Sequence, residues 1–268
     1  TMPGGGARGV RRGATVFAAR SVSGVKHAVP CGLARDDDIA VAYRRAFTGD
    51  PVAAFGGIVA ANRKVTLDMA KEMKPVFYEI VIAPEYEPAA LELLQEKGDL
   101  RILCAGLPPG YGDVEPGYLD LRRVKGGLLV QSSDSLPEGD VSMKTATRRD
   151  PSREEVADML FAWRAVKHVK SNAILMIKNK TLLGMGAGQP SRIVSARVAI
   201  EKAGDKTAGS VLASDAMFPF PDVVEAVAAS GVTAIIQPGG SKKDDESIKA
   251  ADAHNMAMVF TGVRHFRH

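Results

Sequence analysis

The chain has 268 residues and a mass of 28.4 kDa, enough for one large domain or two ordinary ones. Hydrophobic residues make up 46% and charged residues 25%, which is typical of a soluble globular protein. No apolar run approaches the roughly 20 residues that a membrane span needs. With only two cysteines, Cys31 and Cys104, the composition excludes a disulfide scaffold and a cysteine-rich zinc module. We therefore expect a cytoplasmic protein without a membrane partner.

The formal net charge of +4 is concentrated near the N-terminus. Residues 1–35 carry six basic side chains and no acid, so the remainder has 29 basic and 31 acidic residues. A nearly neutral body does not require a basic face, and we expect no nucleic-acid partner. Residues 1–20 are rich in Gly and Arg, show no amphipathic period and are predicted to form a flexible arm.

From residue 21 onward, short apolar runs alternate with helical patterns, which predicts an α/β fold with helices covering the sheet. In the first half we expect strands at 23–29, 57–61, 79–83 and 100–104, helices at 36–49, from Thr66 and from Pro88 to Gly98, and a strand pair within 118–131.

The polar, turn-rich stretch 132–152 predicts a linker between two lobes, residues 21–150 and 151–268. In the second lobe we expect a helix at 153–169, a hairpin at 173–186 that turns at Asn179–Lys180, a helix from about Ser191, strands at 209–214, 232–237 and 256–260, and helices at 222–229 and 243–255.

A weak internal repeat supports two related lobes. Residues 81–103 and 212–236 share an apolar strand, a Pro-bearing loop, an apolar-faced helix, a closing Gly and another strand. Any βαβ unit has these features, so the repeat indicates duplication without proving it.

Lys26 and His27 form the first candidate for chemistry, at the end of an expected strand before the turn Pro30–Gly32. A fixed cation beside a group that titrates near neutrality suits general acid–base catalysis. An exposed Lys beside a structural His is the alternative. The segment has part of the zinc deaminase signature, but Val29 stands where that signature has Glu and its second Cys is missing, so we predict no zinc.

Three further segments place polar groups at the ends of expected strands. Gly184–Arg192 offers glycines and a helix N-terminus to an anion, or simply a tight turn capped by Ser191. Asn172 either caps a helix or points its amide into a cleft. The loop Ser214–Asp222 combines polar strand-end groups with an apolar surface suited to a flat ring, or is a buried loop in which Asp222 caps the next helix.

Nine segments occur in an order that resembles the AICAR transformylase part of the bifunctional AICAR transformylase/IMP cyclohydrolase family. They are Lys26–Ala34 (KHAVPCGLA), Asp50–Val59 (DPVAAFGGIV), Val81–Glu85 (VIAPE), Arg122–Val130 (RRVKGGLLV), Lys167–Ile174 (KHVKSNAI), Gly186–Arg192 (GAGQPSR), Ser214–Phe220 (SDAMFPF), Gln237–Ser241 (QPGGS) and Phe260–His268 (FTGVRHFRH). The resemblance covers about residues 22–268.

The resemblance implies two cytidine-deaminase-like lobes without zinc, and a homodimer with active sites at the interface. The implied reaction transfers the formyl group of 10-formyltetrahydrofolate to the 5-amino group of phosphoribosylaminoimidazolecarboxamide (AICAR) and yields FAICAR, in the synthesis of inosine monophosphate. A bound monovalent cation is left open.

The resemblance also assigns roles to residues. His27 is the candidate base or proton shuttle, Lys26 supports the developing charge and Asn172 holds the formyl group, each worth roughly 2–4 kcal/mol in the transition state. Arg264 is the candidate for the nucleotide phosphate. The remaining candidates are Glu79, Phe55, Gly188 and Arg192 for AICAR and Met217, Pro219 and Asp222 for the folate side of the cleft.

Three departures from the family pattern qualify these expectations. The Arg-Tyr-Gly-x-Asn-Pro-His-Gln motif that usually precedes the Lys-His pair has no counterpart in residues 1–25, Val29 replaces a polar residue, and the cyclohydrolase domain is missing. The alternative function is a non-catalytic homologue that binds nucleotide or folate or acts as a dimerisation partner. A zinc-dependent deaminase is a third reading, disfavoured by Val29 and Ala34.

Overall fold

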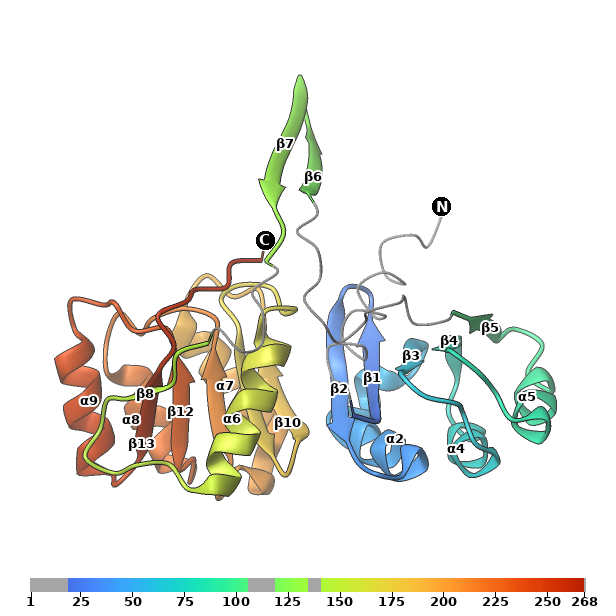
Figure 1. Cartoon of the computed structure of the whole chain (residues 1–268), viewed down its shortest axis with the longest axis horizontal. Coiled ribbons are helices and arrows are strands. Elements are labelled where there is room, and N and C mark those ends of the chain that lie inside the picture. The colour runs from blue at the N-terminus through green and yellow to red at the C-terminus, as the bar shows by residue number, and fades with distance from the viewer. Residues whose placement is uncertain (1–18, 106–118, 135–140, 268) are drawn as a thin grey trace.

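The computed structural model describes residues 19–105, 119–134 and 141–267. Within these ranges the chain forms one eleven-stranded mixed sheet and a separate two-stranded hairpin (Figure 1). The predicted α/β class, with helices covering a mixed sheet, is confirmed. The predicted arm falls almost entirely on residues 1–18, outside the described part of the chain.

The first half of the sheet has the strand order β5-β4-β3-β1-β2. Its strands are β1 (Ser21–Lys26), β2 (Val29–Arg35), β3 (Gly57–Ala61), β4 (Tyr78–Ala83) and β5 (Arg101–Cys104). Its helices are α2 (Ile39–Phe47), α3 (Pro51–Ala54), α4 (Leu67–Met73) and α5 (Pro88–Gln95). Side-chain caps start three of them, since Asp38, Asp50 and Thr66 accept hydrogen bonds from free N–H groups of the first turn.

The second half continues the sheet in the order β10-β9-β11-β12-β13-β8. Its strands are β8 (Lys144–Thr145), β9 (Ile174–Lys178), β10 (Thr181–Gly186), β11 (Val211–Ser214), β12 (Ala234–Gln237) and β13 (Ala257–Phe260). Its helices are α6 (Arg153–Val166), α7 (Arg192–Ala203), the 3₁₀ turn η2 (Gly204–Thr207), α8 (Asp222–Ala229) and α9 (Asp244–Ala253). The hairpin arm consists of β6 (Leu119–Val124) and β7 (Gly127–Ser132).

Apart from the short α3 and η2, both halves repeat one series of elements: an antiparallel hairpin, then three helices that alternate with three parallel strands. In this series β4–α5–β5 corresponds to β12–α9–β13. The sequence repeat instead paired residues 81–103 with 212–236, which form β11–α8–β12, so that pairing was wrong by one strand–helix unit. The reason is that successive βα units of such a fold have the same pattern of Pro starts and Gly stops.

The two halves meet along β2 and β10, where Ala34 and Thr181 form the described strand pair. Lys202 of α7 is ion-paired with Asp50, and the Lys206 ammonium donates to the Thr48 carbonyl at 3.0 Å. Few backbone contacts therefore join β2 to β10 at this seam. The charged side chains of Lys202 and Lys206 provide further contacts between the two halves.

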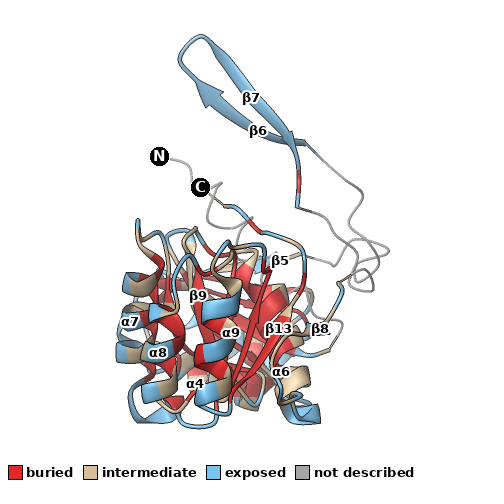
Figure 2. Ribbon diagram, turned by 90° about the vertical axis from the view of Figure 1, so that its left-hand side faces the viewer, coloured by how far each residue is buried: buried red, intermediate tan, exposed pale blue. Residues whose placement is uncertain are grey.

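Helices cover the two faces of the second half, whereas one face of the first half lacks a described helix. Leu175, Val211 and Ile236 pack under α6, while alternate residues such as Met176 and Leu212 pack under α7, α8 and α9. Figure 2 shows these strands buried between helices. In the first half α2, α4 and α5 cover one face, and no residue of a described helix belongs to the small apolar cluster on the other.

Most expected elements are present, with ends shifted by a few residues, and the Asn179–Lys180 turn is confirmed, both residues having positive φ. The strand expected at 23–29 is present as β1 but ends at Lys26, because the chain turns at His27–Ala28. The turn expected at Pro30–Gly32 is wrong, since these residues lie inside β2. The stretch 132–152 contains β8, which pairs with β13 at the sheet edge. Among the described residues no helix is long and apolar enough to cross a membrane.

Candidate functional site

The predicted site residues gather at one edge of the sheet. Strands β1, β10, β11, β12 and β13 run toward this edge, and β3, β4 and β9 start from it, as the pairing directions require. Lys26 and His27 follow β1, Asn172 precedes β9, and Arg264 follows β13. The residues form two groups, one on each half of the sheet.

The second-half group lines a cavity of about 350 Å³. Six predicted residues contribute to its wall: Asn172, Arg192, Met217, Pro219, Asp222 and Arg264. They come from four segments far apart in the sequence, at the carboxyl ends of the parallel strands, where open α/β sheets bind ligands. Gly188 is not among the lining residues; it is exposed in the turn after β10 at φ 68°, and its N–H donates to the Lys170 carbonyl.

The side-chain amide of Asn172 has a fixed orientation in this cavity. Its Oδ1 accepts from Arg192 Nη2 at 2.6 Å, and its Nδ2 donates to the Gln189 carbonyl at 2.9 Å. A guanidinium only donates and a carbonyl only accepts, so the amide cannot be flipped. The second hydrogen of Nδ2 has no protein partner among the described residues, which leaves one N–H donor for a ligand.

Arg192 is buried, with its side chain 6% exposed, and it contacts a carboxylate. Its Nη1 donates to Asp215 Oδ1 at 2.5 Å and to Ser214 Oγ at 2.9 Å. The helix cap predicted for Ser191 is present in position only, because its side chain makes no capping hydrogen bond. The guanidinium thus donates to protein groups from both of its terminal nitrogens, Nη1 and Nη2.

Arg264 lies exposed at the rim of the same cavity. Its Nη2 is 3.6 Å from Met217 Sδ, and among the described residues it has no carboxylate partner. Gly240 has a φ of 89°, and a Cβ built on it would lie 3.3 Å from Arg264 Nη2. The glycine therefore leaves room for the arginine, whose charge is free to meet an anion.

The loop after β11 gives the cavity an apolar wall. Phe218 is fully buried and anchors the loop, while Met217, Pro219 and Phe220 face outward. Phe266 of the C-terminal segment adds a second exposed ring to the lining. Asp222 is exposed at the start of α8, with Oδ1 accepting from the Val223 N–H at 2.9 Å.

The first-half group surrounds the end of β1. Lys26 Nζ donates to the carbonyls of Phe55 and Gly56, at 2.8 and 2.9 Å, and the Phe55 ring lies 5.4 Å from that of Phe77. His27 is exposed in the hairpin turn at φ 55°, a left-handed conformation that is uncommon for residues other than glycine. Glu79 is exposed on β4, next to the start of β3.

A cavity of about 240 Å³ separates the two groups at the seam between the halves. Residues of β2 and β10 line it, together with Lys26, Asp50 and Lys202. Burial, reinforced by the charge of Asp50, raises the pKa of the Cys31 thiol to about 11. The thiol is therefore protonated at neutral pH and is not a nucleophile.

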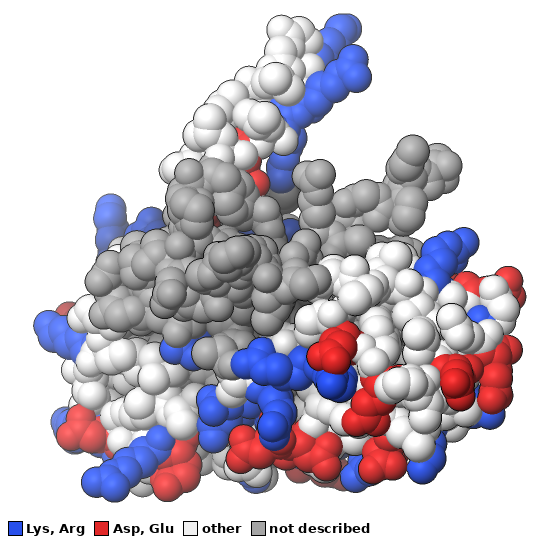
Figure 3. Space-filling model, turned by 45° about the vertical axis from the view of Figure 1, so that its right-hand side comes forward, with Lys and Arg blue, Asp and Glu red and all other residues white. Residues whose placement is uncertain are grey.

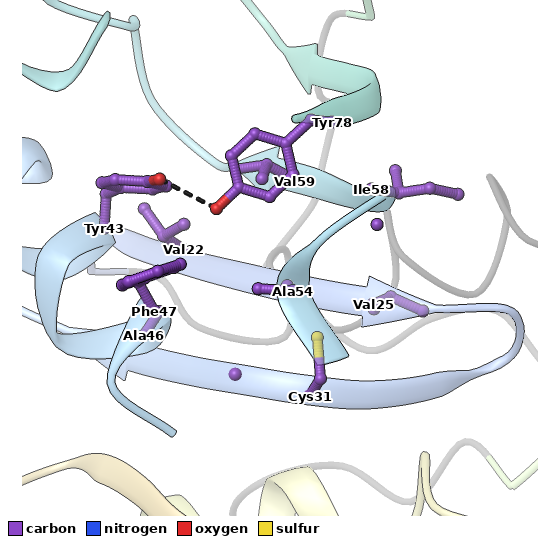
Figure 4. Close-up of a pocket in the computed structure, with 13 residues that line it drawn as sticks. Val22, Val25, Cys31, Tyr43, Ala46, Phe47, Ala54, Ile58, Val59 and Tyr78 are labelled. Atoms are coloured by element: carbon purple, nitrogen blue, oxygen red, sulfur yellow. Dashed lines mark hydrogen bonds between the residues drawn. The ribbon is translucent and has the colours of Figure 1, made fainter. Parts of the chain in front are cut away.

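A third cavity, shown in Figure 4, is only about 10 Å³ and is lined by residues of the β1–β2 hairpin, of α2 and α3 and of β3, together with Tyr78. The Tyr43 and Tyr78 hydroxyls hydrogen-bond to each other at 2.8 Å beside it, and the other labelled side chains, the Cys31 thiol included, are mainly apolar. Its volume suffices for one water molecule at most, so it is a packing void and not a ligand site.

In the described ranges no three His, Cys, Asp or Glu side chains form a group able to hold a metal ion. Three contributors to the site were not predicted from the sequence. Phe266 lay in a segment singled out only for its motif, Phe77 lay between the expected helix from Thr66 and the expected strand at 79–83, and Asp215 had no pattern that indicated a buried ion pair. Only the strand-end position of Asp215 gave a signal.

A comparison with protein families identifies the lineage. The family described as "AICARFT/IMPCHase bienzyme" matches residues 9–202. The chain belongs to this family. The resemblance drawn from the nine sequence segments is confirmed.

Relatives of this AICARFT/IMPCHase chain carry the name bifunctional purine biosynthesis protein PurH. The one from Thermoanaerobacter sp. (strain X514) is 52% identical over 244 residues, which is 91% of this chain and 47% of the relative. The one from Bacillus thuringiensis (strain Al Hakam) is 49% identical over 252 residues, 94% of this chain and 48% of the relative. The chain thus spans about half the length of the curated relatives it matches.

Among solved structures, Acinetobacter baumannii RibD, form 2, matches with a TM-score of 0.28 and 13% identity over 37% of this chain and 32% of that chain. This likeness is too small to support any conclusion about the fold.

Proposed function

We propose that this chain is an AICAR formyltransferase, which transfers the formyl group of 10-formyltetrahydrofolate to AICAR in purine biosynthesis. The observation that carries the proposal is the second-half cavity. It combines an amide N–H of Asn172 without a partner among the described residues, the Arg264 guanidinium, which has no carboxylate partner among them, and apolar walls beside Phe220 and Phe266. Family membership supports the same assignment.

These groups suit formyl transfer to an aromatic amine. The amine nitrogen of AICAR forms a bond to the formyl carbon, the bond from that carbon to N10 of the folate breaks, and N10 takes up a proton. The Asn172 N–H donates to the formyl oxygen as it gains negative charge. His27 removes the proton from the amine, which is a weak nucleophile because it is conjugated to the imidazole ring, and Lys26 supports the developing charge.

Both the base and the amide must lie within hydrogen-bond reach of the reacting atoms. In one chain β1 and β9 are three strand spacings apart, roughly 14 Å, and the seam cavity separates them further. We therefore propose that each active site takes Lys26 and His27 from one chain and Asn172 from a second copy. This makes the protein a homodimer with its sites at the interface.

The hairpin arm supports a dimer. It extends from the site edge of the body (Figure 1), and Figure 3 shows it as largely uncharged with Lys and Arg toward its end. One face carries Leu119, Leu121, Leu128 and Val130, each at least 55% exposed. An isolated two-stranded hairpin is marginally stable in water, and exposed aliphatic side chains favour packing against another chain.

The arm is also attached to the candidate site. Asp134, two residues after β7, hydrogen-bonds through Oδ2 to His265 Nδ1 at 2.5 Å. His265 follows Arg264 directly, so the base of the arm and the cation at the cavity rim are held together.

The finer expectations are part of the same proposal. They are two lobes at 21–150 and 151–268 with cytidine-deaminase-like topology, a cytoplasmic location and, as an open question, a monovalent cation. The repeated order of elements in the two halves supports the lobes.

The test is an assay of the purified chain with AICAR and 10-formyltetrahydrofolate, in which absorbance follows tetrahydrofolate release. We expect turnover that is lost in His27→Ala. If the chain shows no turnover while AICAR still raises its melting temperature, the formyltransferase proposal is overturned in favour of a binding-only homologue.

A further inference from the structure

Asp215 is a buried carboxylate that the proposed chemistry does not use. It follows β11 directly, and its side chain is 1% exposed. Its Oδ1 accepts from Arg192 Nη1 at 2.5 Å and from the Ala173 N–H at 3.1 Å, and Ser171 Oγ donates to its Oδ2. All three of these donors lie next to Asn172 in the sequence or on the arginine that contacts it.

We propose that Asp215 is the positioning residue that fixes the Asn172 amide for formyl transfer, and that it acts through Arg192. The inference rests on the proposed function and adds a residue that touches neither substrate. Its chemical role is to hold a guanidinium whose other edge binds the amide oxygen of Asn172.

The geometry of Arg192 carries this inference. A guanidinium is planar and rigid, so a carboxylate that fixes Nη1 also fixes the direction of Nη2. Nη2 donates to Asn172 Oδ1 at 2.6 Å and thereby sets the direction of the free N–H on Nδ2. A transition-state donor must point at the place where charge develops, and a small rotation of this amide would misdirect it.

The backbone around Asp215 is held independently of its charge. The Asp215 N–H donates to the Ala173 carbonyl at 3.3 Å, and its carbonyl accepts from the His265 N–H at 2.9 Å. Both bonds remain when the carboxylate is replaced by an amide of the same shape. Asp215→Asn therefore removes the charge opposite Arg192 while the three chain segments keep their backbone contacts.

The first experiment measures kcat and KM for AICAR in Asp215→Asn. We expect kcat to fall about 10- to 100-fold, because loss of one directed donor costs up to about 1000-fold, with KM changed by less than about threefold, because Arg264 is untouched. The matched control is Asp205→Asn, an exposed carboxylate in η2, which should leave both constants unchanged. An unchanged kcat, or a raised KM alone, overturns the proposal.

A double-mutant cycle tests whether the effect passes through Arg192. Once Arg192→Gln has removed the guanidinium, adding Asp215→Asn should lower kcat no further. Losses that multiply would show that Asp215 acts by another route and contradict the proposal. Should Asp215→Asn fail to fold, Arg192→Lys replaces it, since a single ammonium keeps the charge but cannot bind both partners; an unchanged kcat there is equally contradictory.

Two readouts do not depend on turnover. The NMR signal of the Asn172 side-chain amide, assigned by its loss in Asn172→Ala, should shift in Asp215→Asn and lose protection from hydrogen exchange. Trp163, the only tryptophan, has its ring 4.5 Å from His265, so unchanged fluorescence reports that the C-terminal segment is still seated. If the wild-type chain shows no turnover, the proposed function fails, while an unaltered Asn172 signal separately overturns the positioning role.

Discussion

The two halves of the sheet have the same order of elements and present different chemistry at the shared edge. The second half holds a cavity whose wall includes Asn172, and Arg192, paired with the buried Asp215, binds the amide of Asn172. The first half holds an exposed histidine at a hairpin turn, above a lysine fixed by two carbonyls. A repeated order of elements can therefore present different side chains at the same edge of the sheet.

The hairpin turns give the largest contrast between the halves. His27 and Asn179 are the first turn residues of corresponding hairpins, at φ 55° and 50°. His27→Gly should lower kcat roughly 10²- to 10⁴-fold, the usual contribution of a general base, without loss of stability, because glycine adopts this φ freely. Asn179→Gly is the control and should leave kcat unchanged. Turnover assays measure kcat and urea unfolding measures stability in both variants. A similar kcat in His27→Gly and Asn179→Gly would show that His27 takes no part in the mechanism.

The next largest effect is expected when the cation at the cavity rim, Arg264, is removed. Arg264→Ala should raise KM for AICAR roughly 10- to 100-fold, because a charge-assisted contact to the phosphate is lost, and the change should shrink at high salt. Arg148→Ala is the matched control, since that side chain is 91% exposed beside Asp252. Steady-state kinetics at two salt concentrations measure the effect. An unchanged KM in Arg264→Ala would mean that the phosphate binds elsewhere.

Gly56 tests how the first half holds its lysine. It has a φ of 64°, and a Cβ on it would lie 2.8 Å from Lys26 Nζ. Gly56→Ala should lower kcat about tenfold by displacing the ammonium, and should cost about 1–2 kcal/mol of stability through backbone strain. Gly98→Ala has open space around its Cβ and should change neither quantity. Steady-state kinetics and urea unfolding compare Gly56→Ala with Gly98→Ala. The same kcat in the two variants would contradict the claim that the position of the Lys26 ammonium matters for turnover.

The smallest effect is expected for a substitution in helix α6, which has no described counterpart in the first half. Burial acts to raise the pKa of Glu155, but hydrogen bonds from Arg149 and Ser152 outweigh it and hold the pKa below its ordinary value of 4.5. The ionised carboxylate therefore stabilises the fold above about pH 4.5, and this contribution is lost as the pH falls through the lowered pKa. Glu155→Gln should lose about 1 kcal/mol at pH 7.

Urea unfolding from pH 7 to pH 3 measures this contribution. The difference between wild type and Glu155→Gln should narrow as the pH falls. A difference that stays constant would mean that the charge of Glu155 does not stabilise α6.

The sequence predicted the order of elements well because apolar periods, caps and Gly stops are local signals. Helix 222–229 and strand 57–61 have the predicted bounds. The β1–β2 hairpin was missed because its turn residues, His27 and Ala28, lack the Asn-Gly pattern that marks such turns.

The site was predicted less completely, for a physical reason. Motif order singled out six residues of one cavity, although it could not show that they share it. The burial of Arg192 and its pairing with Asp215 depend on segments that are far apart in the sequence and meet only in the folded chain. The separation of Lys26 from Asn172 across the seam cavity likewise depends on how the strands are arranged in the folded chain. A single sequence has no local signal for such contacts.

The most direct test of a site shared between two chains is complementation between His27→Ala and Asn172→Ala, each inactive alone. The two variants, carrying different tags, are co-expressed and the mixed dimer is purified. In that dimer one site carries both substitutions and the other carries neither, so about half of the wild-type activity should return. A mixed dimer as inactive as its parents, under conditions where the wild type turns over, would place His27 and Asn172 in the same chain's site and contradict the account.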